Sequence, residues 1–367
     1  MDEARPSHTA LRVAMRRAAH QLHDARPLVF EDPFAVPILP PDARAELQRT
    51  PAASRKPFSA ALRAFMVCRA RFAEDVLASG VRDHGVRQAL ILGAGLDTFA
   101  LRNPYPDVHI FEVDHPATQS WKREILAASK LPNPEALTFV PVDFERQSLR
   151  QQLLHAGFDF TIPTATAWLG VVPYLTQEAF AATARVLGRL PAGSSLVFDY
   201  SQPREVLSFV EQLMHDSLSA RVAQAGEPFQ LFFTPQSLAE ELPRYDLKVV
   251  EDLDSDALNA RYLANRPDGL HLRGKAGRQR CPDFPDSLLD TLRYRVGNVG
   301  DDRGCRRCPT DGTPGDPADH PARNRAATGP GRSAGYTPDD APDDATGGIL
   351  NGRGGGEDCL GCTVQPG

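Results

Sequence analysis

The sequence predicts an α/β protein built on a mainly parallel sheet with helices on both faces. From residue 86 onward, short apolar runs alternate with helix-like segments across brief turns, which is typical of such sheets. A glycine turn follows the first apolar run, and carboxylate residues follow the second and third runs. Ligands of parallel sheets bind at the carboxyl ends of the strands, so we expect a binding site there.

Three helices are expected before the sheet, at residues 7–23, 42–48 and 58–79. The first is amphipathic because five residues recur at helical spacing: Ala10, Val13, Ala14, Arg17 and Ala18. Six strands are expected at 88–92, 108–113, 137–142, 164–172, 195–200 and 247–253. The helix-like segments between or beside them lie near 96–103, 115–130, 146–156, 177–190, 202–224 and 235–243.

The last 93 residues have a different composition. Residues 275–367 hold 17 of the 28 glycines and five of the six cysteines, and few apolar positions recur periodically there. Such a stretch cannot bury enough surface to offset its chain entropy, so we expect a disordered tail of low complexity. Translation of a GC-rich gene out of phase from about codon 275 is one explanation of its composition. Its two CxxC pairs lie 50 residues apart, too far for a compact zinc ribbon.

Charge and hydropathy indicate a small-molecule partner. The net charge is −6 and the pI is about 5.9, which gives no general attraction to nucleic acid. No apolar run resembles a membrane span, and the first residues do not resemble a secretory signal. We therefore expect a cytoplasmic protein that binds neither nucleic acid nor membrane. Nothing in the sequence indicates its oligomeric state.

The most distinctive motif is the turn Ile91-Leu92-Gly93-Ala94-Gly95-Leu96-Asp97-Thr98. Glycine at 93 and 95 lets the backbone turn tightly and approach a ligand closely. A purely structural turn, with Asp97 near a helix N-terminus, explains the motif equally well when it is considered alone.

Carboxylates after the next two strands favour a nucleoside site. Glu112 and Asp114 stand at the end of the second strand, where a carboxylate can accept both ribose hydroxyls. Asp143 and Phe144 follow the third strand and suit an exocyclic amine and an apolar ring, as in adenine.

Two nucleoside cofactors fit this arrangement. A dinucleotide such as NAD places its pyrophosphate at the helix N-terminus, where Asp97 would repel it. S-adenosyl-L-methionine has no phosphate but carries an ammonium, a sulfonium and a carboxylate. The first two suit an acidic residue, and an arginine can hold the third. The charges favour S-adenosyl-L-methionine, with NAD as the alternative.

The chain resembles the leucine carboxyl methyltransferase superfamily and its large bacterial branch of S-adenosyl-L-methionine-dependent methyltransferases. The resemblance covers roughly residues 5–274. The matching stretches are SHTALRVAMRRA (7–18), RARFAED (69–75), ILGAGLDT (91–98), FEVDHPATQSWK (111–122), VPVDF (140–144), WLGVVPYLT (168–176) and SSLVFDY (194–200).

The resemblance implies a class I methyltransferase sheet, Rossmann-like, with six parallel strands and one antiparallel strand. Residues 1–84 would form an N-terminal helical lid, 85–274 the donor-binding domain and 275–367 the tail. Arg69 would hold the donor carboxylate; from the residues alone it fits a charged helix surface as well. Gly93, Ala94 and Gly95 would line the methionine half, Asp114 would bind the ribose, and Asp143 and Phe144 the adenine. With Asp97, these complete the expected cofactor site; no metal is expected.

The resemblance also implies methyl transfer to oxygen, a carboxylate or a hydroxyl, of a small molecule by in-line displacement. Many relatives carry glutamate where this chain has Leu169, so one polar contact to the donor is missing from the pattern. The alternatives are an NAD-dependent oxidoreductase and a non-catalytic relative that binds a nucleoside. If a hydroxyl acceptor needs a general base, the candidates are His115, Tyr174, Asp199 and Tyr200; packing or helix capping explains each of them at least as well.

Overall fold

The computed structural model describes residues 6–49, 57–207, 209–272 and 292–299. The chain divides into two units, residues 1–306 and 307–367. All described residues belong to the first unit, and the two CxxC pairs lie outside the described residues. No helix in the described part is both long and apolar enough to cross a membrane.

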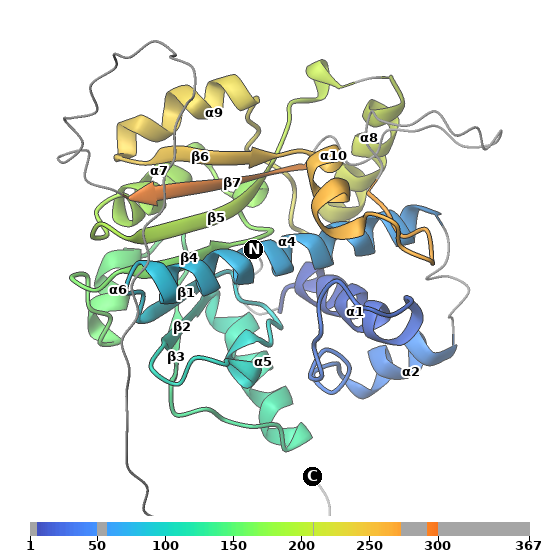
Figure 1. Cartoon of the computed structure of the whole chain (residues 1–367), viewed down its shortest axis with the longest axis horizontal. Coiled ribbons are helices and arrows are strands. Elements are labelled where there is room, and N and C mark those ends of the chain that lie inside the picture. The colour runs from blue at the N-terminus through green and yellow to red at the C-terminus, as the bar shows by residue number, and fades with distance from the viewer. Residues whose placement is uncertain (1–5, 50–56, 208, 273–291, 300–367) are drawn as a thin grey trace, which may run out of the picture. The chain divides into compact units, whose positions relative to one another are not determined.

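A seven-stranded sheet forms the centre of the first unit (Figure 1), in the order β3-β2-β1-β4-β5-β7-β6. Its strands are β1 (Gln88–Leu92), β2 (His109–Asp114), β3 (Leu137–Pro141), β4 (Thr164–Trp168), β5 (Ser194–Ser201), β6 (Lys248–Leu253) and β7 (Leu292–Val299). Strands β1 to β5 pair in parallel, and β7 runs antiparallel to both β5 and β6. The expected sheet of six parallel strands and one antiparallel strand is confirmed.

Strand β7 corrects the predicted tail. Residues 292–299 lie within the stretch expected to be disordered, yet they pair along the full length of β5 and most of β6. The backbone groups of β5 and β6 need hydrogen-bond partners, and β7 supplies them to both strands. Composition missed this strand because eight residues are few among their glycine-, proline- and arginine-rich neighbours. The rest of the predicted tail lies outside the described residues, so its disorder stays a prediction, as do the domain boundaries at 84 and 274.

Helices cover the sheet on both sides (Figure 1). The chain forms α1 (His8–His23), α2 (Pro41–Arg49), α4 (Pro57–Asp83), α5 (Pro116–Ser129), α6 (Leu149–His155), α7 (Gln177–Leu187), α8 (Phe209–Gln224), α9 (Pro235–Glu241) and α10 (Ser255–Leu258). Helix α4 packs against β4 and β5, and α1 packs on α4. Helix α4 therefore connects α1 to the sheet.

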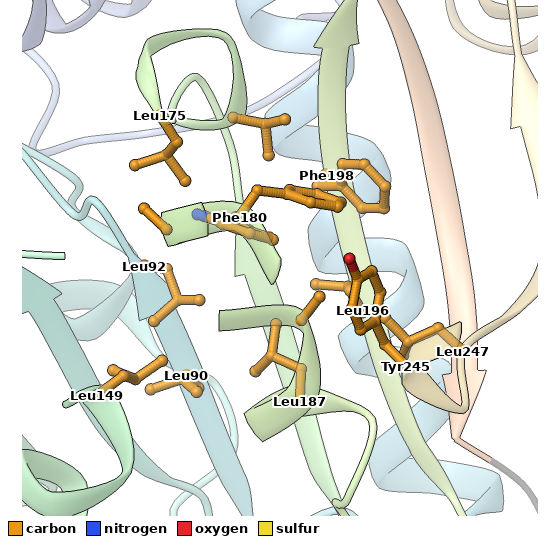
Figure 2. Packing of buried hydrophobic residues seen from close by; sticks show 14 of the residues in the cluster. Leu90, Leu92, Leu149, Leu175, Phe180, Leu187, Leu196, Phe198, Tyr245 and Leu247 are labelled. Carbon is orange, nitrogen blue, oxygen red and sulfur yellow. The ribbon is translucent and has the colours of Figure 1, made fainter. Parts of the chain in front are cut away.

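The alternation of side chains along the strands explains why both faces are covered. In β1, Leu90 and Leu92 face a core shared with Leu149 of α6 and Phe180 of α7, as Figure 2 shows. Ala89, one position away, faces a separate cluster with residues of α4. Fully buried strands of this kind read as continuous apolar runs, which is why the sequence predicted them well.

Local signals place the helix starts beside the strand ends. The imidazole of His115 accepts a hydrogen bond from the Ala117 N–H at the start of α5, and Pro116 occupies the first helical position. The Thr176 hydroxyl likewise caps α7. Strand β4 ends at Trp168, earlier than predicted, because Gly170 turns the chain at φ +71°.

Candidate functional site

A cavity of about 460 Å³ lies beside the carboxyl ends of β1 to β4. The structure brings all eight residues of the predicted cofactor site to its wall: Arg69, Gly93, Ala94, Gly95, Asp97, Asp114, Asp143 and Phe144. They come from α4, from the end of β2 and from the loops after β1 and β3. Their individual roles stay predictions.

The glycine turn after β1 needs its glycines for two reasons. Gly93 and Gly95 have φ values of +67° and +50°, a region that side chains with a Cβ disfavour. A Cβ on Gly93 would also overlap the side chain of Val171 in the loop after β4. The turn therefore brings bare backbone to the cavity.

Asp114 is buried at the end of β2, with both carboxylate oxygens held by backbone N–H groups. Its Oδ2 accepts from Gly95 N–H and its Oδ1 from His115 N–H. Burial raises the pKa of Asp114, and the two N–H donors oppose that rise. Each carboxylate oxygen can accept a second hydrogen bond, so Asp114 can still accept hydroxyl donors from the cavity.

Glu112, the other carboxylate of this strand, does not line the cavity. It pairs with Lys122 of α5 at 2.5 Å, between Oε2 and Nζ, and both side chains are buried. The Lys122 side chain is only 2% exposed. The Lys122 ammonium is one of the cations that hold the pKa of Asp97 down against burial, and it opposes the rise that burial causes in the pKa of Asp114.

Arg69 reaches the cavity from α4 rather than lying on a charged helix surface. Its Nη1 lies 3.3 Å from Oδ2 of Asp199, in a buried ion pair. The other oxygen, Asp199 Oδ1, accepts the Gly170 N–H. A Cβ on Gly170 would come within 2.9 Å of Arg69 Nη1, so the loop after β4 fits closely against the guanidinium.

Asp97 has a partner that the sequence did not predict. Arg17 of α1 donates from Nη1 to Asp97 Oδ2 at 2.8 Å. Burial alone would raise the pKa of Asp97, but the nearby cations, Arg17 first among them, hold it below its usual value. The one available signal was a charged residue within the apolar stripe of the first helix.

The end of the cavity next to β3 is formed by Asp143 and Phe144. Asp143 Oδ1 accepts the Glu145 N–H at 3.0 Å, and Arg146 lies 3.7 Å from Oδ2. Phe144 packs on the large core cluster beneath. A polar acceptor and an apolar ring therefore stand together, as adenine recognition requires.

The four candidate general bases separate into two pairs. His115 and Tyr174 line the cavity, whereas Asp199 and Tyr200 are not among its lining residues. The Tyr200 hydroxyl donates to Asp252 Oδ2 at 3.1 Å in the core. Sequence reasoning missed a further lining residue, Glu227, which follows α8 and carries no recognisable motif. Leu169 also lines the cavity and packs on the cluster around α4.

The cavity combines bare backbone, paired buried charges and an apolar floor, and the described residues contain no group of three or more potential metal ligands.

A sequence profile of the leucine carboxyl methyltransferase family matches residues 10–188. The "Putative S-adenosyl-L-methionine-dependent methyltransferase YktD" of Bacillus subtilis is 36% identical over 207 residues, which are 56% of this chain and 67% of YktD. A protein of the same description from Mycobacteroides abscessus is 30% identical over 240 residues, 62% of this chain and 71% of that protein.

This chain belongs to the leucine carboxyl methyltransferase family. Membership makes it an S-adenosyl-L-methionine-dependent methyltransferase and confirms the resemblance drawn from the motifs. Among solved structures, a DUF574 family protein from Streptomyces avermitilis gives a TM-score of 0.46 at 18% identity, covering 80% of this chain and 97% of that protein.

Family membership favours S-adenosyl-L-methionine over NAD more strongly than the charge of Asp97 does. Asp97 was expected to repel a pyrophosphate, but its pairing with Arg17 neutralises much of that charge. The family profile ends at residue 188. Cavity residues further along the chain, Glu227 included, therefore lie beyond the matched segment.

Proposed function

We propose that this S-adenosyl-L-methionine-dependent methyltransferase transfers the methyl group to oxygen, a carboxylate or a hydroxyl, of a small molecule. The observation that carries the proposal is that all the expected donor-binding residues line one and the same cavity of about 460 Å³. Its size is that of small-molecule sites, and donor and acceptor must share it.

The residues at the cavity wall fit the donor. Asp114 retains acceptor capacity for the ribose hydroxyls, and Arg69 offers a guanidinium to the carboxylate. The glycine turn leaves room where a Cβ would intrude. When bound, S-adenosyl-L-methionine supplies a methyl group on a sulfonium, a good leaving group.

The protein contributes mainly position and exclusion of water. Displacement at the methyl carbon requires alignment of the attacking oxygen, and holding both reactants in place lowers the entropic part of the barrier. Helix α1 helps to cover the cavity, since Ala10, Val13 and Ala14 are among its lining residues. A carboxylate acceptor needs no base; a hydroxyl acceptor gains from one.

Calorimetry with S-adenosylhomocysteine and with NAD tests the donor site. We expect binding of the first and none of the second; the reverse would overturn the assignment. Transfer of a tritiated methyl group to a panel of phenols, alcohols and carboxylic acids tests the acceptor. Labelled product on oxygen supports the proposal, and product exclusively on nitrogen or carbon contradicts it. Tight donor binding without transfer to any class would favour the non-catalytic alternative. A cytoplasmic location stays a prediction.

A further inference from the structure

Glu227 is a buried carboxylate at the cavity wall. Glu227 is only 9% exposed, and its Oε2 has no hydrogen-bond partner among the described residues. Taking a carboxylate oxygen out of water without a hydrogen-bond partner is unfavourable. A group held in this way at a cavity indicates a ligand that supplies the missing hydrogen bond.

Hydrogen bonds hold the segment that carries Glu227 against the rest of the fold. Its N–H donates to the Val222 carbonyl at the end of α8. Three residues later, Gln230 donates from its backbone to the Pro173 carbonyl and from Nε2 to the Tyr174 carbonyl, both at 2.7 Å. The segment that carries Glu227 is thus fastened to the loop after β4.

Tyr174, in the loop after β4, is a neighbour of Glu227 in the cavity wall. Asp143 and Phe144 follow β3, at the edge of the sheet, whereas Tyr174 follows β4 on the other side of the glycine turn. Glu227 is close to Tyr174: burial first, and then the Glu227 carboxylate, raise the pKa of the Tyr174 hydroxyl. Glu227 therefore shares the cavity with the predicted donor contacts without being one of them.

The charge of Glu227 selects among acceptors. An anionic acceptor would meet repulsion from the Glu227 carboxylate, whereas a hydroxyl can donate the hydrogen bond that Oε2 lacks among the described residues. Positive charge is also near, since burial and the cations Arg12, Arg69 and Arg221 lower the pKa of Arg16 to about 10. Arg16 is not among the residues that line the cavity, whereas Glu227 is. Arg69 does line it, but its guanidinium is paired with Asp199 and is the predicted partner of the donor carboxylate.

Resting on the proposed function, we propose that Glu227 forms the acceptor subsite and that the acceptor group is a hydroxyl rather than a carboxylate. Oε2 accepts a hydrogen bond from this hydroxyl and then takes its proton. As the acceptor oxygen bonds to the methyl carbon, its O–H bond breaks and the proton passes to Oε2. The electron pair of the broken carbon–sulfur bond stays on sulfur.

A binding experiment tests this placement without knowledge of the acceptor. Sinefungin carries an ammonium-bearing carbon where the donor carries its methylated sulfur, so its charge probes the point of transfer. Calorimetry compares sinefungin with S-adenosylhomocysteine for the wild type, Glu227→Gln and Glu205→Gln; Glu205 is an exposed glutamate before α8. We expect Glu227→Gln to weaken sinefungin binding about tenfold, the size of a hydrogen bond between charged groups, with S-adenosylhomocysteine affinity unchanged. Glu205→Gln should change neither.

The proposal would be overturned if Glu227→Gln bound sinefungin as tightly as the wild type does. It would also be overturned if the substitution weakened the binding of sinefungin and of S-adenosylhomocysteine equally. Failure of the wild type to bind either ligand would instead refute the proposed function. With an acceptor found by the tritium assay, we expect Glu227→Gln to lower kcat by about 10²- to 10⁴-fold, with the donor KM little changed. An acceptor methylated on a carboxylate would overturn this inference and leave O-methylation standing.

Discussion

Arg17 and Asp97 join the first helix to the glycine turn. Arg17 donates from Nη1 to Asp97 Oδ2 at 2.8 Å and from Nη2 to the Leu96 carbonyl. Nearby, the Ser7 N–H donates to the Thr118 hydroxyl at 3.1 Å and ties the start of α1 to α5. Both contacts run from α1 to segments beside the cavity, the glycine turn and α5. They therefore hold α1 in its place over the cavity.

Arg17→Ala should destabilise the protein by about 3 kcal/mol, since removing one partner of a buried pair leaves the other charge uncompensated. We take the low end of the usual range because the Asp97 side chain is 25% exposed. Urea denaturation measures the change. Arg26→Ala is the control: its pair with Glu31 is 74% and 68% exposed, so its loss should cost less than about 1 kcal/mol. Equal stability of the two variants would show that the Arg17 pair does not anchor the helix.

Asp114→Ala should weaken S-adenosylhomocysteine binding by about 1–3 kcal/mol, the cost of leaving buried hydrogen-bonding groups unpaired. The variant removes the acceptor of the Gly95 N–H as well as the predicted ribose contact. Calorimetry checks the affinity, with Asp107→Ala as the control because Asp107 is exposed in the turn before β2. An unchanged Kd for Asp114→Ala would remove this carboxylate from the donor site.

Gly170→Ala should displace Arg69 and weaken S-adenosylhomocysteine binding, because the added Cβ would come within 2.9 Å of Nη1 and 3.1 Å of Nη2. Gly157→Ala is a matched control: Gly157 has a comparable φ of +84°, and a Cβ there meets nothing within 4 Å. Both substitutions carry a similar backbone strain of about 1–2 kcal/mol. The stability of both variants should therefore fall, more for Gly170→Ala because Arg69 also pairs with the buried Asp199, and only Gly170→Ala should lose affinity. Equal affinities of the two variants for S-adenosylhomocysteine would show that Arg69 does not take part in donor binding.

The strands and the predicted cofactor residues could be read from the sequence because their signals are local. Strand β1 matches its predicted bounds, 88–92, since a buried parallel strand is a continuous apolar run. Gly93 and Asp114 were identifiable because one precedes a helix-like segment and the other ends a strand, so topology alone brings them to one edge of the sheet. The positive φ of the glycines then follows from the tight turn.

Residues whose environment depends on distant parts of the chain could not be predicted. The burial of Lys122 depends on the packing of α5 against β2, which places its side chain beside Glu112. Glu227 stands 53 residues beyond Tyr174 in the sequence, without a motif, and folding brings the two together. Strand β7 could not be predicted from the composition of the residues around it in the sequence. Its structure depends on pairing with strands such as β5, which lie far away along the chain.

Asp268→Asn should destabilise the protein at neutral pH, and the difference from the wild type should shrink in acid. Asp268 accepts hydrogen bonds from the Ala25 N–H and from Arg266, both at 2.7 Å, and so ties the chain after α10 to the segment after α1. Although burial opposes the shift, these donors hold the pKa of Asp268 at about 2. A carboxyl whose folded-state pKa is depressed stabilises the fold above its unfolded pKa, near 3.9, and that contribution fades as the pH falls toward 2. Urea denaturation at pH 7, 4 and 3 should show a full difference at pH 7 and a clearly smaller one at pH 3. A difference that stays constant down to pH 3 would mean that the Asp268 contacts do not depend on its charge.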